Sequence, residues 1–163
     1  MSTGALILAR LSDPEKLLST AEFLERSEFV ECWNAVDGHV DLVAKIKTSA
    51  ANLPEQFQTL AGIDDLQVYD LTDESGNLVC NPELSHAFLF LDIQPDTLNT
   101  VKSLLRTYKN IIFCSQVNGT SELIAVLNGT SFQEIDQIVN RGIRTIDGVL
   151  RVKQDRVINL KQI

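Results

Sequence analysis

Two carboxylates stand at matching places after two Gly-containing turns. Asp41 comes three residues after Gly38, and Glu122 comes three residues after Gly119. A carboxylate at such a place, together with neighbouring backbone N–H groups, can bind the charged ends of a small zwitterion such as an amino acid. It can instead fix the turn itself by accepting hydrogen bonds from backbone N–H groups, as Asx residues do. The sequence leaves both interpretations open.

The residues between each glycine and its carboxylate complete a candidate ligand site. Histidine is the side chain whose charge changes near neutral pH, so His39 can act as a pH-sensitive ligand contact, or it can simply face solvent. The glycines are expected to supply a positive φ in the turns, with close approach of a ligand as the alternative. The predicted ligand-binding residues are Gly38, His39, Val40, Asp41, Gly119, Thr120, Ser121 and Glu122.

Sequence motifs of catalysis and metal binding are missing. The chain has no phosphate-binding loop, no GxSxG and no HExxH, and it offers no convincing Ser/His/Asp set. Its two histidines and three cysteines are far apart, which argues against both a zinc site and a disulfide framework. We therefore predict no catalytic residue, no metal, no cofactor and no enzymatic activity.

Composition indicates a globular, acidic chain. The net charge is −8 over 163 residues, which disfavours general binding to the phosphate backbone of nucleic acids. No apolar run reaches the roughly 20 residues of a membrane helix, and the first residues lack the basic start of a signal peptide. A cytoplasmic protein without membrane contact is expected.

The chain contains an internal repeat, and this repeat organises the candidate site. Shifting the sequence by 81 residues aligns Gly38 with Gly119 and Asp41 with Glu122, and also Leu8 with Leu89. Further on, Ile63 aligns with Val149 at a shift of 86. Because the two turns correspond, the two candidate carboxylates belong to equivalent hairpins.

Each copy is predicted to fold as strand, helix, strand, strand, helix, strand. The strands expected in the first copy are residues 5–11, 29–36, 40–47 and 66–71, with helices at 12–26 and 52–60. The second copy repeats this order, with strands at 86–93, 111–117, 122–127 and from 149, and helices at 95–107 and 131–146. The predicted units are residues 1–71 and 86–163, joined by a polar linker at 72–85.

This order is that of the ferredoxin-like α+β plan, with two helices on one face of a four-stranded antiparallel sheet. Several strands, such as ALILARL and AFLFLDI, are apolar on both faces. A sheet with one wet face would alternate apolar and polar residues. We therefore expect the two sheets to pack face to face in a pseudo-dimer that resembles a dimeric α/β barrel. Pairing of each copy with another chain is the alternative.

Each copy resembles the C-terminal ligand-sensing (RAM) domain of the Lrp/AsnC transcription regulators. The pattern Val-x-Gly-x-x-Asp/Glu-Leu carries this resemblance. It reads Val36-Asp37-Gly38-His39-Val40-Asp41-Leu42 and Val117-Asn118-Gly119-Thr120-Ser121-Glu122-Leu123. The resemblance implies two tandem copies that form a covalent pseudo-dimer, a small effector near the hairpin loops, and further oligomerisation.

The chain departs from that family in two ways. Nothing in the sequence corresponds to the family's helix-turn-helix, so direct DNA binding is not expected. The aromatic residue that often precedes the acidic position is replaced by Val40 and Ser121, which leaves the ligand open. The leading hypothesis is a non-enzymatic regulatory module that binds a small ligand, such as an amino acid, and oligomerises.

Three other functions stay open at this stage. The chain can be an interaction module that joins full-length Lrp/AsnC regulators through like surfaces. It can be a pair of ACT domains, although their usual glycine between the first strand and first helix is missing here. It can also be a ferredoxin-like small oxygenase, which requires a histidine or polar constellation inside the sandwich.

Overall fold

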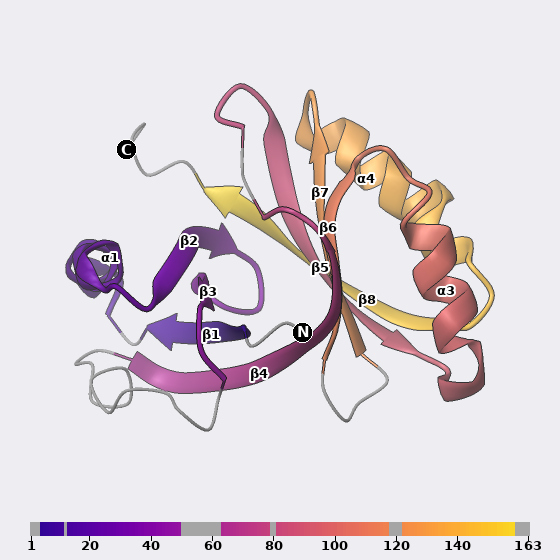
Figure 1. Cartoon of the computed structure of the whole chain (residues 1–163). Helices are drawn as coiled ribbons and strands as arrows, with labels where there is room; N and C mark the ends of the chain where they lie inside the picture. Colours follow the sequence, from indigo (N-terminus) through magenta and orange to yellow (C-terminus); the bar gives the residue numbers. More distant parts are fainter. Residues whose placement is uncertain (1–3, 12, 50–62, 79–80, 118–121, 159–163) are drawn as a thin grey trace.

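The protein forms a closed barrel of eight antiparallel strands with its helices on the outside (Figure 1). The computed structural model describes residues 4–11, 13–49, 63–78, 81–117 and 122–158. Around the barrel the strands follow the order β1-β3-β2-β8-β5-β7-β6-β4. In Figure 1, α1 lies on one side of the barrel, and α3 and α4 lie together on the opposite side.

The elements follow the predicted order within the described residues. The strands are β1 Ala5–Leu11, β2 Val30–Asp37, β3 Leu42–Ile46, β4 Ile63–Gly76, β5 Ser85–Ile93, β6 Ile111–Val117, β7 Glu122–Gly129 and β8 Val149–Ile158. The helices are α1 Leu17–Arg26, α3 Leu98–Leu105 and α4 Phe132–Arg141. Short 3₁₀ turns at Pro14–Lys16, Pro95–Thr97 and Ile143–Thr145 adjoin them. The helix predicted for residues 52–60 lies outside the described residues.

The barrel consists of two ferredoxin-like halves, which confirms the predicted fold class. Each half has the same strand order, β4-β1-β3-β2 in the first and β8-β5-β7-β6 in the second. The edge strand β2 pairs with β8, and the edge strand β4 pairs with β6. These two junctions leave neither sheet with a free edge, which removes the usual site of edge-to-edge aggregation.

Three apolar layers explain why the strands are apolar on both faces. One layer fills the barrel and includes Leu6, Phe88 and Phe113. The other two layers lie outside the barrel: Leu89 and Val139 belong to the layer under α3 and α4, and the third layer lies under α1. Each strand therefore contributes alternate side chains to the barrel interior and to a helix-covered layer.

The register of the strands corrects the sequence alignment in β1. Leu8 pairs with Val43, whereas Phe90 pairs with Ile124. Val43 and Ile124 are equivalent at a shift of 81, so the structural counterpart of Leu8 is Phe90. The sequence alignment, which matched Leu8 with Leu89, is therefore wrong by one residue in this strand. A slip of one residue exchanges the two faces of a strand. Leu8 and Phe90 both fill the barrel, but Leu89 lies under the helices.

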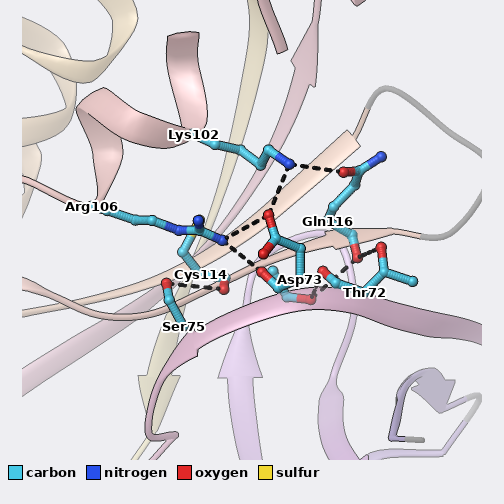
Figure 2. A network of polar contacts seen from close by, with 8 residues as sticks. Thr72, Asp73, Ser75, Lys102, Arg106, Cys114 and Gln116 are labelled. Carbon is cyan, nitrogen blue, oxygen red and sulfur yellow. Dashed lines mark hydrogen bonds and ion pairs between the residues drawn. The ribbon is translucent and has the colours of Figure 1, made fainter. Parts of the chain in front are cut away.

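Strand β4 is longer than the strand expected from the sequence and runs to Gly76, so the predicted boundary at residue 71 falls inside it. A polar network fastens the end of β4 to the second half (Figure 2). Asp73, at a β-bulge with φ 53°, accepts a hydrogen bond from Lys102 Nζ at 2.9 Å and pairs with Arg106 at 3.2 Å. Lys102 also donates to Gln116 Oε1 at 3.1 Å. The bulge thereby turns a side chain of the first half toward α3.

Within the described ranges, no helix has the length and apolar character needed to cross a membrane.

Candidate functional site at the barrel mouth

A cavity of about 180 Å³ opens at one end of the barrel. At this end β1, β2, β5 and β6 finish, and their antiparallel neighbours begin. Both halves line the cavity. The first half contributes Leu8, His39, Gln67 and Tyr69, and the polar lining of the second half is Asp92, Glu122, Arg151 and Lys153. A larger hollow of about 510 Å³ lies against α1, but only α1 and the segment after it line that hollow.

His39 enters the cavity from the turn between β2 and β3, and Asp155 of β8 holds it there. The backbone N–H of His39 donates to Asp155 Oδ1 at 2.9 Å. His39 Nδ1 lies 2.7 Å from Asp155 Oδ2, an ion-pair distance without the angle of a hydrogen bond. Asp155 is only 1% exposed, so a single buried carboxylate contacts both the backbone and the ring of His39. The Phe90 ring packs edge-on against the imidazole, with 4.8 Å between centroids.

Gly38 allows this contact, but not through a positive φ. Its backbone does not adopt the left-handed conformation that the turn was expected to need, so that expectation is wrong for Gly38. A Cβ atom at this position would instead lie 1.8 Å from Asp155 Oδ1. Glycine is required here because the carboxylate of Asp155 occupies the space of a side chain.

Two neighbouring carboxyl groups form the acidic side of the cavity. Asp92 lies directly across from Glu122 on β7 and from Arg151 on β8. Arg151 Nε donates to Asp92 Oδ2 at 2.8 Å, and its Nη2 lies 2.7 Å from the same oxygen. Burial favours the neutral form of Asp92, but the hydrogen bond and charge of Arg151 outweigh it, and the pKa of Asp92 is lowered.

Glu122 is shifted in the opposite direction. Burial, followed by the hydrogen bond with Asp92 and the negative charge of Asp92, raises the pKa of Glu122. Two close carboxyl groups in different surroundings thus divide the roles, since Asp92 stays ionised and Glu122 keeps its proton to higher pH. Burial and the charge of Glu122 also raise the pKa of the Tyr69 hydroxyl, which donates to Gln67 Oε1 at 2.9 Å.

Lys153 provides positive charge on the same side of the barrel. It pairs with Phe90 across β5 and β8, and its charge lowers the pKa of both Asp92 and Glu122. The side chain of Lys153 is exposed at the cavity, whereas Arg151 is engaged with Asp92. The cavity therefore presents one accessible ammonium group close to a carboxylate and a protonatable carboxyl group.

The predicted site residues divide into four groups in the structure. His39 and Glu122 line the cavity. Gly38 leaves room for the carboxylate of Asp155, which contacts His39. Val40 is buried in the barrel interior. Asp41 Oδ2 accepts a hydrogen bond from the backbone N–H of Leu11 at 2.8 Å, so the contact of this carboxylate is with the end of β1 and not with the turn that precedes it. Gly119, Thr120 and Ser121 lie outside the described residues.

The sequence prediction missed most of the polar lining. The missed residues are Gln67, Tyr69, Asp92, Arg151, Lys153 and Asp155. A signal for three of them was present: Arg151, Lys153 and Asp155 alternate along one strand and lead to the interior residue Val157. Charged residues at the interior positions of a barrel strand indicate a polar site, because burial of charge is costly unless it is paired.

The two halves contribute unequally to this site. Since Leu8 pairs with Gln67 and its counterpart Phe90 pairs with Lys153, Gln67 and Lys153 occupy equivalent positions. By the same shift of 86, Tyr69 is the counterpart of Asp155. The first half thus places neutral side chains where the second half places charged ones. Both copies of the repeat therefore provide the strands of the barrel, but the charged residues at these positions of the cavity come from the second copy.

A comparison with known protein families finds a match for the second half of the chain. Residues 86–160 match the model of the Lrp/AsnC ligand binding domain. The second half is thus similar to the Lrp/AsnC ligand binding domain. The match covers β5 to β8 and includes Asp92, Glu122, Arg151, Lys153 and Asp155. A comparison with curated proteins finds no significant match.

Solved structures share the fold of the whole chain, of which the Lrp/AsnC domain is one half. The siroheme decarboxylase NirDL aligns with a TM-score of 0.75 at 12% identity, over 96% of this chain and 71% of that one. A monooxygenase from Fusobacterium nucleatum, described as putative in its structure report, aligns with a TM-score of 0.60 at 8% identity, over 96% of this chain and 92% of that one. An anthrone oxidase-like protein aligns with a TM-score of 0.54 at 12% identity, over 96% of this chain and 91% of that one. At these identities the likeness concerns the fold.

These relatives overturn the expectation that the protein is not an enzyme. The fold that carries the Lrp/AsnC domain also carries a decarboxylase and proteins related to oxidases and monooxygenases. The expectation rested on missing sequence motifs, but the polar groups of this barrel mouth come from five separate segments of the chain. A site assembled in this way has no local motif, so a motif search cannot decide whether it is catalytic.

Proposed function

We propose that the protein is a ligand-binding regulatory module of the Lrp/AsnC type that takes a small carboxylic acid, with an α-amino acid as the first candidate, at the barrel mouth. The observation that carries this proposal is the cavity of about 180 Å³ that presents Lys153 beside Asp92 and Glu122. A zwitterion needs a cation and an acceptor of hydrogen bonds a few ångströms apart, and this arrangement offers both.

The chemistry of the lining suggests the orientation of the ligand. The exposed ammonium group of Lys153 would bind the ligand carboxylate. The ligand amino group would donate to the carboxyl oxygens of Asp92 and Glu122, where an added positive charge compensates the repulsion between the two. The apolar part of the lining consists of Leu8, Phe90, Leu123 and Ile124, and it would contact the ligand side chain. Since both halves line the cavity, a single half would bind the ligand poorly.

We also propose that the module associates further, with itself or with another protein that contains this domain. In the part of the chain that the structure describes, four large apolar side chains are exposed, among them Leu104 on α3 and Leu150 on β8, which are 43% and 68% exposed. Light scattering after size-exclusion chromatography tests this part of the proposal, and a monomer at micromolar concentration would argue against it.

A thermal-shift screen with each of the common α-amino acids tests the ligand proposal. A ligand that binds only the folded protein at 100 times its Kd stabilises it by about 2.7 kcal/mol, which shifts the melting temperature by several degrees. We expect such a shift with a small subset of the amino acids. If neither amino acids nor simple carboxylic acids of the same size change the melting temperature, the proposal fails.

A further inference from the structure

We propose that the barrel mouth is also a site of acid–base catalysis, in which His39 removes a proton from the carbon next to the carbonyl group of a small 2-oxo acid and Glu122 protonates the carbonyl oxygen. This inference rests on the proposed function, because it needs a small carboxylate in the same cavity. A 2-oxo acid has the carboxylate and the size of an amino acid, and it offers a C–H bond that a positioned base can break.

The surroundings of His39 are those of a general base. Its Nδ1 is buried and lies 2.7 Å from the carboxylate of Asp155, so Nε2 is the ring nitrogen that remains for a ligand. Asp155 itself is 1% exposed and cannot reach the cavity other than through the imidazole. A buried carboxylate behind a histidine fixes the ring and stabilises the imidazolium that forms when the other nitrogen takes a proton. Asp155 is therefore a positioning residue.

The ring of His39 has little freedom to turn away from the cavity. The Phe90 ring packs against it edge-on at 4.8 Å, and the backbone N–H of His39 is held by Asp155 Oδ1 at 2.9 Å. The side chain is still 31% exposed. A solvent-facing histidine at a turn tip would not be expected to have its backbone, Nδ1 and ring face all in contact with neighbouring residues.

Glu122 provides the complementary acid on another strand of the same cavity. Burial and the adjacent Asp92 raise the pKa of Glu122, so of the two neighbouring carboxyl groups Glu122 is the one that favours its protonated form and can donate to a ligand oxygen. Lys153 would hold the ligand carboxylate, which turns the carbonyl oxygen toward Glu122 and the C–H bond toward His39.

The proposed step balances without any oxidant, reductant or cofactor. The C3–H bond of the 2-oxo acid breaks, and its proton goes to His39 Nε2. The electron pair of that bond forms the C2=C3 double bond of the enol. The π electrons of the carbonyl group then take the proton of the Glu122 carboxyl group at oxygen. The reverse step returns a proton to C3 and regenerates both residues, so the activity is keto–enol interconversion, visible as exchange of the C3 hydrogens with solvent.

The test measures hydrogen exchange on the full chain. With 2-oxobutyrate in D₂O, proton NMR follows the loss of the C3 methylene signal with and without protein, and calorimetry measures binding of 2-oxobutyrate to the same samples. The variants are His39→Asn, Asp155→Asn and Glu122→Gln. The exposed Lys109→Met serves as a control for loss of a lysine outside the cavity.

We expect the wild-type protein and Lys109→Met to exchange equally. His39→Asn and Glu122→Gln should each slow exchange by about 100-fold or more, the usual contribution of a general base or acid, while the Kd changes by only a few-fold. Asp155→Asn should slow exchange at saturating 2-oxobutyrate while the Kd again changes by only a few-fold, because the imidazole loses the carboxylate that holds it in place.

Four outcomes would overturn the inference. Absence of 2-oxobutyrate binding would remove the inference, and the proposed function would fall with it only if the amino acids and the other small carboxylic acids also fail to shift the melting temperature. Binding without exchange would remove the inference alone and leave the ligand site standing. Exchange that persists in His39→Asn would show that another group is the base. Trapping of a covalent adduct on Lys153 by borohydride, with exchange lost in Lys153→Met, would replace acid–base catalysis by imine chemistry.

Discussion

Gly38 of the first half and Asp155 of the second half lie in direct contact. The carboxylate of Asp155 leaves no room for a side chain at Gly38. A Cβ atom on Gly38 would lie 1.8 Å from Asp155 Oδ1 and 2.5 Å from its carboxyl carbon. Asp155 in turn holds both the backbone and the ring of His39. The short turn of the first half and the last strand of the second half therefore build the cavity together.

Replacing Gly38 by alanine should destabilise the protein. The added methyl group has to displace a buried carboxylate, and overpacking of this kind costs about 1–3 kcal/mol. Chemical denaturation measures the free energy of unfolding. Gly129→Ala is a control, because the nearest atom to its Cβ is Ile135 Cγ1 at 3.1 Å, much farther than the 1.8 Å at Gly38. Equal stability of Gly38→Ala and the wild-type protein would contradict the contact.

Glu122→Gln should become more stable than the wild-type protein as the pH rises. The pKa of Glu122 is raised in the folded state, so its favourable contribution is complete at pH values below the ordinary value of 4.5 and is lost as the pH rises through the higher folded value. Glutamine imitates the protonated carboxyl group at every pH. Denaturation curves at pH 4 and pH 7 should therefore diverge in favour of the variant at pH 7.

Glu134→Gln should show the opposite trend and serves as its control. Hydrogen bonds from the side chain and backbone of Thr130 lower the pKa of Glu134, so its contribution is present above the ordinary value and is lost as the pH falls. Glu134→Gln should be less stable than the wild-type protein at pH 7 and equal to it in strong acid. The same sign of change in both variants would argue against the paired carboxyl groups of the cavity.

The network in Figure 2 predicts different costs for two substitutions of Asp73. Asp73→Asn keeps a residue that tolerates φ 53° and loses the ion pairs to Lys102 and Arg106. Because the Asp73 side chain is 51% exposed, that loss should be only about 0.5–1 kcal/mol. Asp73→Ala should cost about 1 kcal/mol more, since alanine is strained in the left-handed region. Equal unfolding free energies of the two variants would refute the role of the bulge.

Cys114 should resist alkylation in the folded protein. Burial raises the pKa of its thiol to about 11, against the smaller opposing effects of Arg106 and Lys102. The half-buried Cys32 should react first with iodoacetamide at pH 8, as followed by peptide mass spectrometry. In denaturant the two should react at similar rates. Labelling of Cys114 as fast as Cys32 without denaturant would contradict its place in the core.

The sequence was sufficient for the fold because periodicity and turns are local signals. The duplicated hairpin pattern around Gly38 and Gly119 predicted two equivalent units, and strands that are apolar on both faces predicted a covered sheet. The register error between Leu8 and Leu89 arose where both faces of a strand are apolar. There, neither face is distinguished by polarity, so a slip of one residue leaves no trace in the pattern.

The site was harder to predict because its parts come from distant strands. Asp41 and Glu122 are equivalent in the sequence, yet Asp41 binds the backbone of Leu11, whereas Glu122 meets Asp92 in the cavity. Asp155 meets His39 only because β8 closes the barrel against β2. Barrel closure is a long-range property, and no spacing within the chain reports which interior side chains will face each other.

Calorimetric titration of the wild-type protein and two lysine variants tests the central claim most directly. The titrant is the amino acid or small carboxylic acid that gives the largest thermal shift. Lys153→Met removes the proposed carboxylate contact, and Lys109→Met removes an exposed lysine elsewhere. Since a hydrogen bond to a charged group contributes about 1.5–3 kcal/mol, we predict binding at least about tenfold weaker in Lys153→Met and unchanged in Lys109→Met. Equal affinity in all three proteins would show that the ligand does not bind at the barrel mouth.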